Sequence, residues 1–383
     1  MTEPSRHAPA SAPSRALDAL RRVLDGSQRH LVVHTSGSTG EPRRVALSGR
    51  ALRASAQATI DVLGGPGRWL LTLPVDHVGG LQVLTRGVVS GLDPVVLDLT
   101  HGFRPETFAA ATAELLERDE ATGVAAPRRY TSLVPTQLRR LLDNPAGRLA
   151  VATYDAILVG GASSEPRLLE NARALGARIV TTYGMSETSG GCVYDGVPFP
   201  GVEVALDADG RVRLRGPVLA DGYLAADGTI DRAATAEAFD PDGWLRTNDA
   251  GVWQDGRLVV VGRLDDVIVS GGVNVAPATV EAAVDSWLDS LGGGESCVVG
   301  VPDDEWGQRV VAVVRCATPA VQAAVSVETA VEQLQAHVSS GLGRESVPRE
   351  IVVVDELPLR GVGKLDRRAA LSRAVAATSR TRS

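Results

Sequence analysis

Short apolar segments of strand length alternate with segments of helical length through the first half of this chain. The apolar segments lie at residues 31–34, 69–74, 94–97, 129–134, 156–159 and 179–182. The helical segments lie at residues 15–24, 50–63, 105–118, 136–142 and 165–175. Alternation of this kind is typical of parallel sheets whose faces are covered by helices. The sequence therefore predicts an α/β fold.

The character of the sequence changes twice after residue 200. Residues 201–261 consist of short β-like runs broken by Gly and Asp, which predict a small, mostly antiparallel β subdomain. Residues 265–383 predict a small α+β module that contains a Gly-rich turn near its start. A chain of 383 residues is also long for one domain. We predict a tail and first helix over residues 1–26, a large domain of parallel sheets layered by helices over residues 27–264, and a small α+β domain over residues 265–383.

Composition and charge exclude two classes of protein. The formal net charge is −7 and the arginines are scattered, so the chain lacks the basic stripe that nucleic-acid binding needs. No run approaches the length of about 18 apolar residues that a membrane helix requires, so we expect no membrane insertion. The first residues, 1–14, are rich in Pro, Ala and Ser and do not resemble a signal peptide.

The three cysteines, Cys192, Cys297 and Cys316, are far apart and show no metal-ligand spacing. We interpret them as buried or idle thiols. Three unpaired thiols fit a reducing compartment, so we expect a cytoplasmic protein. The sequence leaves the oligomeric state open, a homodimer included.

Lys364 is the one lysine among the 39 Lys and Arg residues of the chain. A general bias toward arginine explains the imbalance but not the exception. An ammonium group is a compact point charge, whereas a guanidinium is a planar fork, so Lys364 suits a role that only a point charge can fill. Gly361 and Gly363 flank it and predict a turn that can approach a ligand closely. The alternative is an incidental surface lysine.

Hydroxyl and glycine residues follow the first predicted strand. They are Thr35, Ser36, Gly37, Ser38, Thr39 and Gly40. Backbone N–H and side-chain O–H groups in such a loop can surround phosphate oxygens. The loop is not a Walker A motif, because that motif needs a Gly-Lys pair followed by Ser or Thr. Taken alone, it could equally be a polar surface turn.

Three further groups of residues follow predicted strands of the parallel sheet, where α/β proteins bind their ligands. They are His77, the segment Gly160, Gly161 and Ala162, and the segment that contains Tyr183, Gly184, Ser186 and Glu187. A glycine pair after a strand allows a flat ring to approach the backbone. A lone histidine, by contrast, is more often structural.

Three separated stretches together resemble the adenylate-forming (ANL) superfamily of acyl-CoA synthetases, luciferases and peptide-synthetase adenylation domains. They are the loop at residues 35–40, Tyr-Gly-Met-Ser-Glu at residues 183–187, and Gly-Arg-Leu-Asp-Asp at residues 262–266 ahead of the Gly-Lys pair at residues 363–364. The resemblance covers residues 31–368. Within it, residues 73–82, 130–138 and 183–196 look most like the short o-succinylbenzoate–CoA ligases of menaquinone biosynthesis.

The resemblance implies a reaction in two steps. A carboxylate attacks the α-phosphate of Mg·ATP to give acyl-AMP and pyrophosphate, and the thiol of CoA then displaces AMP. The implied co-substrates are ATP and CoA, with Mg²⁺ as cofactor and 2-succinylbenzoate as the acid. Two alternatives stay open: a CoA ligase for another aryl or short acyl acid, and a non-catalytic nucleotide-binding sensor. The presence of both Lys364 and Glu187 argues against a sensor.

The resemblance also implies a role for each residue of the nucleotide site. Residues 35–40 would hold the β- and γ-phosphates, residues 160–162 would flank adenine, and Tyr183 and Gly184 would complete the ATP site. Ser186 would contact the α-phosphate. Glu187 would hold Mg²⁺, a hard cation that prefers oxygen ligands. Asp249 and Arg263 would bind the ribose.

The same resemblance implies residues for the acyl, CoA and hinge functions. Lys364 would bridge the acyl carboxylate and the α-phosphate, and His77 would border the acyl pocket and help to exclude water. Ser132 and Gly161 would also contact the acyl group. Asp265 would be the hinge of a mobile C-terminal domain, and Gly271 and Gly272 would approach CoA after rotation.

Two arginine pairs add further expectations. Arg128 and Arg129, with the polar Ser132, are candidates for the second carboxylate of the acid, although a solvated pair at a strand entrance is the favoured alternative for the two arginines. Residues 42–44 read Pro-Arg-Arg where the family has Pro-Lys-Gly. Arg43 can supply charge there, but its donor geometry differs from that of lysine.

Overall fold

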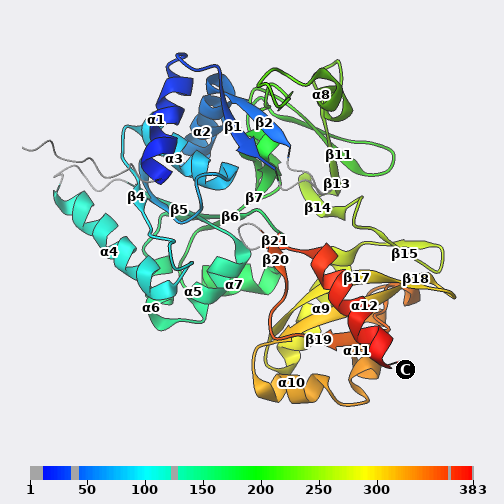
Figure 1. Cartoon of the computed structure of the whole chain (residues 1–383). Helices are drawn as coiled ribbons and strands as arrows, with labels where there is room; N and C mark the ends of the chain where they lie inside the picture. Colours follow the sequence, from blue (N-terminus) through cyan, green and yellow to red (C-terminus); the bar gives the residue numbers. More distant parts are fainter. Residues whose placement is uncertain (1–11, 36–42, 122–127, 361–363, 382–383) are drawn as a thin grey trace, which may run out of the picture. The chain divides into compact units, whose positions relative to one another are not determined.

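The computed structural model describes residues 12–35, 43–121, 128–360 and 364–381. The chain divides into two compact units. The first comprises Met1–Ala205, Arg213–Thr247 and Asp255–Leu258, and the second comprises Leu206–Val212, Asn248–Gln254 and Val259–Ser383. Each unit has its own buried apolar core. Figure 1 shows the helices and strands of the chain.

A seven-stranded sheet forms the centre of the first unit, with the strand order β4-β3-β5-β6-β7-β8-β9. The five strands from β4 to β7 are parallel, whereas β8 and β9 run antiparallel to their neighbours. The strands are β3 (Gly67–Leu71), β4 (Val95–Val96), β5 (Arg128–Leu133), β6 (Ala156–Gly160), β7 (Ile179–Met185), β8 (Gly190–Tyr194) and β9 (Val197–Pro198). The predicted parallel sheet is confirmed, and the carboxyl ends of its parallel strands share one edge.

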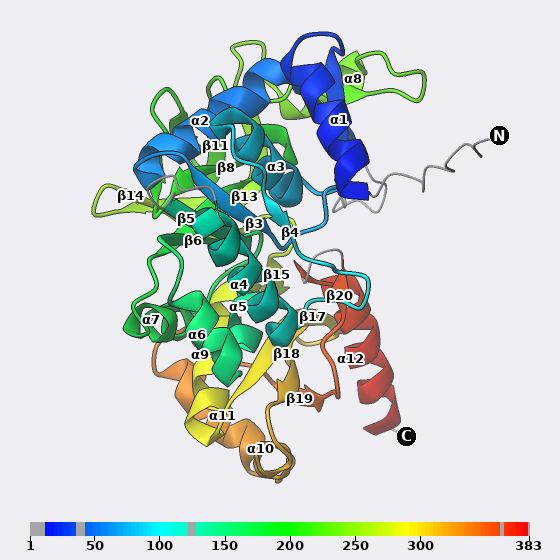
Figure 2. The ribbon, with the colours of Figure 1, turned by 90° about the vertical axis from the view of Figure 1, so that its left-hand side faces the viewer.

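Helices cover both faces of this sheet. Figures 1 and 2 show α1 to α3 on one side and α4 to α7 on the other. The helices are α1 (Ala12–Leu24), α2 (Gly49–Leu63), α3 (Val78–Ser90), α4 (Pro105–Ala121), α5 (Pro135–Leu142), α6 (Pro145–Val151) and α7 (Pro166–Ala174). On the second side, Leu70, Phe108 and Ile157 belong to one apolar cluster. Burial of both faces explains why the parallel strands are almost uniformly apolar.

Two of these helices were not predicted from the sequence. Helix α3 begins Val-Gly-Gly, which reads as a turn because glycine disfavours helix. Its residues from Gly80 to Gly87 are all buried, so the helix also lacks the polar face that identifies a surface helix. Helix α6 is short and begins after Asn144, whose side chain accepts hydrogen bonds from the amides of Ala146 and Gly147.

The first predicted strand does not join the parallel sheet. Instead β1 (His30–His34) pairs antiparallel with β2 (Arg44–Ser48), and β2 pairs antiparallel with β12 (Tyr223–Leu224). His34 pairs with Arg44 at the end of β1. Beyond this pair, the amide of Thr35 donates to the carbonyl of Arg43 at 2.9 Å. The pairing also brings Tyr223 beside the start of β2.

A four-stranded sheet with the order β10-β11-β13-β14 contains residues of both units. Its strands are β10 (Glu203–Leu206), β11 (Arg211–Arg215), β13 (Leu245–Gln254) and β14 (Arg257–Arg263), and α8 (Arg232–Ala238) precedes β13. Asp255 and Gly256 join β13 to β14 with positive φ values of 50° and 73°, as a two-residue hairpin turn requires. The predicted β subdomain is present, but α8 was not predicted.

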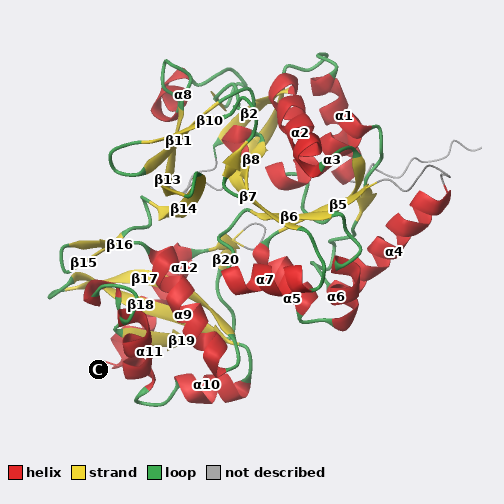
Figure 3. Cartoon of the chain, turned by 180° about the vertical axis from the view of Figure 1, so that it is seen from behind, coloured by secondary structure: helices red, strands yellow, loops and turns green. Residues whose placement is uncertain are grey.

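The second unit contains a five-stranded sheet in which β17 and β18 form a long antiparallel hairpin (Figure 3). Its strands are β15 (Ile268–Ser270), β16 (Val273–Val275), β17 (Gly294–Asp303), β18 (Gly307–Cys316) and β19 (Glu350–Val353), and β20 (Leu359–Arg360) pairs with β21 (Lys364–Leu365) outside it. The helices are α9 (Pro277–Leu291), α10 (Pro319–Val325), α11 (Ala330–Ser339) and α12 (Arg367–Thr381). The predicted α+β module is therefore present.

Alternating residues of β17 face two separate apolar clusters, as the period of a strand requires. Val298 belongs to the cluster that contains residues of α9 and α11. Cys297 and Val299 belong to the other cluster, together with Ala370 and Ala374 of α12. Helix α12 was not predicted from the sequence, and its apolar residues are mostly small alanines. No helix in the described part of the chain is long and apolar enough to cross a membrane.

Candidate active site

The carboxyl end of β7 carries the segment that contains Ser186 and Glu187. These two residues belong to a short 3₁₀ turn, η1 (Ser186–Thr188), which follows β7 directly. The pairing of β7 with β8 shifts register between Tyr183 and Gly184. Gly184 has a φ of 159°, and a Cβ there would lie 2.2 Å from the carbonyl oxygen of Gly190. Only glycine fits this position, and it lets the chain turn out of the sheet.

Side-chain and backbone contacts hold the turn in place. The Thr188 hydroxyl donates to the carbonyl of Gly190 at 2.6 Å, and the amide of Met185 donates to the Thr188 oxygen at 2.8 Å. Ser189 is buried with a φ of 52°, a conformation that costs free energy for a residue with a Cβ. Strain of this kind is often found at functional sites.

Glu187 is only 9% exposed, and its carboxylate is held by Tyr223 from β12. The Tyr223 hydroxyl donates to Oε1 of Glu187 at 2.8 Å. Burial, together with the negative charge of Glu187, raises the pKa of Tyr223, so the phenol stays protonated and keeps donating. No motif in the sequence singled out Tyr223, because its partner lies on a different element.

Arg43 continues this chain of contacts to the end of the hydroxyl loop. Its guanidinium lies 5.0 Å from the centroid of the Tyr223 ring and forms a 2.8 Å ion pair with Glu237 of α8. The amide of Arg43 also donates to the hydroxyl of Thr35 at 3.3 Å. Thr35 and Arg43 therefore bracket the loop beside Tyr223. The predicted residues Ser36, Gly37, Ser38, Thr39 and Gly40 lie outside the described residues.

The glycine segment after β6 lies next to the end of β7. Gly160 pairs with Thr182 across the two strands, and a Cβ on Gly160 would lie 2.1 Å from the Thr182 hydroxyl oxygen. Gly161 has a φ of 81°. Both Gly161 and Ala162 are exposed. The predicted adenine segment is thus accessible and lies at the same sheet edge as Glu187.

The predicted acyl-pocket residues lie on neighbouring elements. His77 precedes α3, and its side chain is 40% exposed and 3.3 Å from the carboxylate of Asp76. Ser132 is buried near the end of β5. By contrast, Arg128 and Arg129 begin β5 and lie at the amino edge, away from the carboxyl edge of the sheet. Their position does not support contact with the substrate.

The structure identifies a different arginine beside Ser132. Arg86 of α3 is only 3% exposed, and its Nη1 donates to the Ser132 hydroxyl at 3.5 Å. Its Nη2 donates to the hydroxyl of Tyr194 at 3.2 Å, and its guanidinium lies 4.8 Å from the centroid of the Trp69 ring. No carboxylate among the described residues forms an ion pair with it. Burial lowers the pKa of Arg86, but arginine remains protonated in proteins.

A buried charge without a counter-charge is costly, and the contacts of Arg86 with Ser132, Tyr194 and Trp69 offset part of this cost. Arg86 was not predicted from the sequence. The one signal in the sequence was an arginine within a run of apolar and small residues, which reads as neither a surface helix nor a basic patch.

Asp249, Arg263 and Asp265 lie together in the second unit. Arg263 donates to both carboxylate oxygens of Asp265, at 2.8 and 2.6 Å, and lies 3.5 Å from a carboxylate oxygen of Asp249. The structure therefore joins the predicted hinge to the predicted ribose-binding pair. A bound ribose would have to compete with Asp265 for the Arg263 guanidinium.

Gly271 and Gly272 form the exposed turn between β15 and β16. Their φ values are 58° and 79°, so both positions favour glycine. The amide of Gly271 donates to the carbonyl of Trp306 at 2.9 Å. Lys364 lies in β21, where its backbone pairs with Arg360 of β20.

The described residues contain no cluster of three or more His, Cys, Asp or Glu side chains that could hold a metal by themselves. Glu187 alone fits Mg²⁺ when phosphate oxygens and water complete the shell, as is usual for this cation. Burial raises the pKa of Cys192 and of Cys297 to about 12. These two thiols are therefore not nucleophiles, and the interpretation of Cys192 and Cys297 as idle buried thiols is confirmed.

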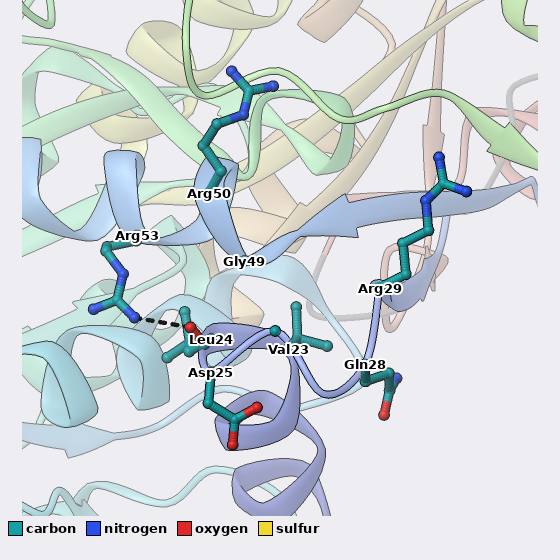
Figure 4. A pocket seen from close by; sticks show the side chains of 9 residues that line it. Val23, Leu24, Asp25, Gln28, Arg29, Gly49, Arg50 and Arg53 are labelled. Carbon is teal, nitrogen blue, oxygen red and sulfur yellow. Dashed lines mark hydrogen bonds between the residues drawn. The ribbon is translucent and has the colours of Figure 1, made fainter.

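A separate pocket of about 530 Å³ lies between the end of α1 and the start of α2 (Figure 4). Arg29, Arg50 and Arg53 line it, but Arg53 donates to the backbone carbonyl of Leu24 at 3.1 Å. None of the predicted site residues lines this pocket. It is therefore distinct from the candidate active site.

Comparison with known proteins identifies the family of this chain. The AMP-binding enzyme family model matches residues 4–224, and the model of the AMP-binding enzyme C-terminal domain matches residues 292–364. A probable 2-succinylbenzoate–CoA ligase from Mycobacterium tuberculosis is 40% identical over 402 residues, covering 96% of this chain and 97% of that protein.

Solved structures with the same fold include an o-succinylbenzoate CoA synthetase from Bacillus subtilis. Its complex with the acyl-adenylate intermediate OSB-AMP gives a TM-score of 0.69 at 27% identity. Its complex with ATP and a magnesium ion gives 0.68 at 26% identity. Both matches cover 88% of this chain and 68% of the other.

Proposed function

Since this chain belongs to the AMP-binding enzyme family, we propose that it is an AMP-forming ligase that joins 2-succinylbenzoate to CoA. The acid would first react with ATP to give acyl-AMP and pyrophosphate. The thiol of CoA would then displace AMP to give the thioester. The family match and the 40% identical relative support the reaction class.

The residues of the first unit suit the adenylation step. In this proposal Glu187 contributes one oxygen ligand to Mg²⁺, which neutralises phosphate charge when bound. The hydroxyl loop between Thr35 and Arg43 surrounds the phosphates, and Gly161 leaves room for the adenine ring. Lys364 supplies the positive charge that lets the acyl carboxylate approach the α-phosphate, since two anions otherwise repel each other.

The observation that carries the choice of acid is the buried guanidinium of Arg86. 2-Succinylbenzoate has two carboxylates, and only one of them is adenylated. The other needs a cation in the acyl pocket, and Arg86 is a buried cation without a described carboxylate partner, next to Ser132. A monocarboxylic acid would leave this charge unpaired. The pocket should therefore favour a dicarboxylate.

A panel of acids tests this proposal. Pyrophosphate release would be measured with ATP, Mg²⁺, CoA and each of 2-succinylbenzoate, its distal monoester, benzoate and a short fatty acid. We expect the highest kcat/KM with 2-succinylbenzoate and the matching thioester by mass spectrometry. A higher kcat/KM for a monoacid would show that the protein is a CoA ligase for another acid. ATP binding without AMP formation from any acid would indicate a sensor.

Replacement of Arg86 tests the argument for the distal carboxylate. Arg86→Met keeps an apolar side chain of similar length but removes the charge. Removing one partner of a buried ion pair costs about 3–5 kcal/mol, so kcat/KM for 2-succinylbenzoate should fall by about 10²–10⁴-fold. The distal monoester should lose little. Arg128→Met, at the other edge of the sheet, is the matched control and should leave selectivity unchanged.

The proposed location is the cytoplasm, which supplies ATP, Mg²⁺ and CoA.

A homodimer remains a prediction, and sedimentation of the purified protein would test it.

A further inference from the structure

Arg367 begins α12, directly after the strand that carries Lys364, and it joins three parts of the second unit. Its Nη1 and Nη2 donate to the two carboxylate oxygens of Glu281 in α9, the second at 2.9 Å. Nη1 also donates to the carbonyl of Val298 in β17 at 3.1 Å. Its Nε donates to Asp266 at 3.1 Å. One side chain thus connects α12 with a helix, a strand and the segment that follows Asp265.

At one end of this network, the carboxylate of Glu281 is buried, and Arg367 compensates its charge. Glu281 is 8% exposed, and its Oε1 also accepts from the amide of Val298 at 2.8 Å. A buried carboxylate of this kind needs its cation, because an uncompensated charge in the interior is strongly destabilising. Arg367 is therefore fixed in position by α9 and β17.

The chain between Lys364 and Arg367 offers little freedom. Lys364 pairs with Arg360 across β20 and β21, and Leu365 pairs with Leu359. The amide of Asp366 donates to the carbonyl of Pro358 at 2.8 Å, and its carboxylate accepts from the amide of Ala369 at 3.0 Å. The backbone of Lys364 is therefore tied to the anchored Arg367 through a hydrogen-bonded strand and a helix cap.

The other end of the network lies beside the predicted hinge. Asp266 follows Asp265 directly, and its side chain is 31% exposed, so the Asp266–Arg367 pair is the accessible part of the network. A backbone rotation at Asp265 displaces Asp266 first. The hydrogen bond from Nε of Arg367 to Asp266 would pass that displacement to α12, and through it to β21, the strand that carries Lys364.

We propose that Arg367 is a positioning residue for Lys364, and that the Asp266–Arg367 pair fixes the Lys364 strand relative to the hinge. This inference rests on the proposed function, in which Lys364 acts in adenylation alone. The pair makes the strand of Lys364 and the segment after the hinge move as one body. Without it, the backbone of β21 is held less firmly. A displacement of about 1 Å at a reacting group can cost about 10²-fold in rate.

Asp266→Ala is the sharper test, because it removes the link but keeps the buried Arg367–Glu281 pair. Single-turnover pyrophosphate release should slow by about 10- to 100-fold with little change in KM for ATP or acid. Thioester formation from preformed acyl-AMP should stay within about twofold of wild type, as it should for Lys364→Ala. Asp266→Glu should restore part of the adenylation rate.

Two variants control for stability. Arg368→Ala removes the exposed neighbour of Arg367 and should change neither step. Arg309→Gln breaks two other ion pairs of the same unit, with Asp303 of β17 and with Glu350 of β19. It should lower the melting temperature without separating the two half-reactions. A separation of the half-reactions by Arg309→Gln would overturn the inference.

Hydrogen exchange gives a readout that does not depend on catalysis. The Asp366 amide should exchange faster in Asp266→Ala than in wild type, whereas amides in the β17–β18 hairpin should not. Equal slowing of both half-reactions, unchanged adenylation, or unchanged exchange at Asp366 would each overturn the positioning role. Absence of acyl-AMP formation by the wild-type protein, with the exchange difference present, would instead refute the proposed function and leave the structural link standing.

Discussion

At the scale of single residues, the carboxylate of Glu187 is oriented by a neutral donor. Tyr223 donates to it at 2.8 Å, and Arg43 lies against the ring of Tyr223. The Tyr223 hydroxyl thereby fixes the direction of the Glu187 carboxylate. In the function that we propose, this orients Glu187 toward Mg²⁺.

Tyr223→Phe should therefore weaken adenylation. A hydrogen bond to a charged group contributes about 1.5–3 kcal/mol, so the Mg²⁺ concentration for half-maximal pyrophosphate release should rise by about 10-fold or more. Calorimetric titration of the protein with Mg·ATP should show weaker binding, with ATP in EDTA less affected.

Tyr154→Phe is the matched control for the loss of a buried hydroxyl. Its hydroxyl contacts Thr112 at 2.8 Å within the other side of the same unit. This variant should lose some stability but keep its Mg²⁺ dependence. An unchanged Mg²⁺ dependence in Tyr223→Phe would show that the hydrogen bond does not orient the metal ligand.

At the scale of elements, the site depends on how β7 leaves the sheet. Gly184 lies where the register between β7 and β8 shifts, and the nearest atoms to an added Cβ belong to the backbone of Gly190 and Gly191. Backbone atoms of a paired strand cannot rotate away as a side chain can. The exit of β7 therefore requires a glycine.

Gly184→Ala should lower the free energy of unfolding by about 1–3 kcal/mol, the usual cost of overpacking, and should displace Glu187. Chemical denaturation and the adenylation rate would measure the two effects. Gly176 also has a positive φ, of 86° against 159° at Gly184, but a Cβ added there would have no atom within 4 Å. Gly176→Ala should cost less and leave adenylation intact. Similar losses in the two variants would show that φ, and not the clash, limits the position.

At the scale of the whole molecule, the proposed residues are divided between the two compact units. Glu187, Gly160 and Arg86 belong to the first, whereas Asp249, Arg263 and Lys364 belong to the second. In the function that we propose, the two half-reactions use different residues of the second unit, so we predict that this unit changes its position between them. Asp265 is the residue where we predict this change.

Asp265→Pro should uncouple the half-reactions, because proline fixes φ at the predicted hinge. Acyl-AMP should still form, while its transfer to CoA should slow strongly in a rapid-quench experiment started from preformed acyl-AMP. Asp265→Ala removes the contact with Arg263 but leaves the backbone free to rotate. This variant should transfer the acyl group to CoA at the wild-type rate. If the alanine variant is as slow as the proline variant, the ion pair matters and the hinge assignment fails.

The sequence by itself determined the parallel sheet and the order of the motifs along it. The strand period, the glycines at strand ends and the segment around Glu187 are local properties, because they depend on neighbours within a few residues. The same local reasoning placed Gly160, Gly161 and Glu187 after strands, and the structure brings all three to one edge of the sheet. Local reasoning did not predict α3 or α12, because their sequences have only weak helical patterns and both helices are stabilised by packing against residues far away in the chain.

Only the tertiary structure decided which side chains meet. Tyr223 and Glu187, Arg86 and Tyr194, and Arg367 and Glu281 are separated by 36, 108 and 86 residues along the chain. Whether an arginine lies in solvent or in the interior depends on which elements pack around it, and residue type alone does not carry that information. For this reason Arg128 and Arg129 looked suitable for the substrate in the sequence. The buried charge of Arg86 became visible only once α3 was packed against β3 and β5.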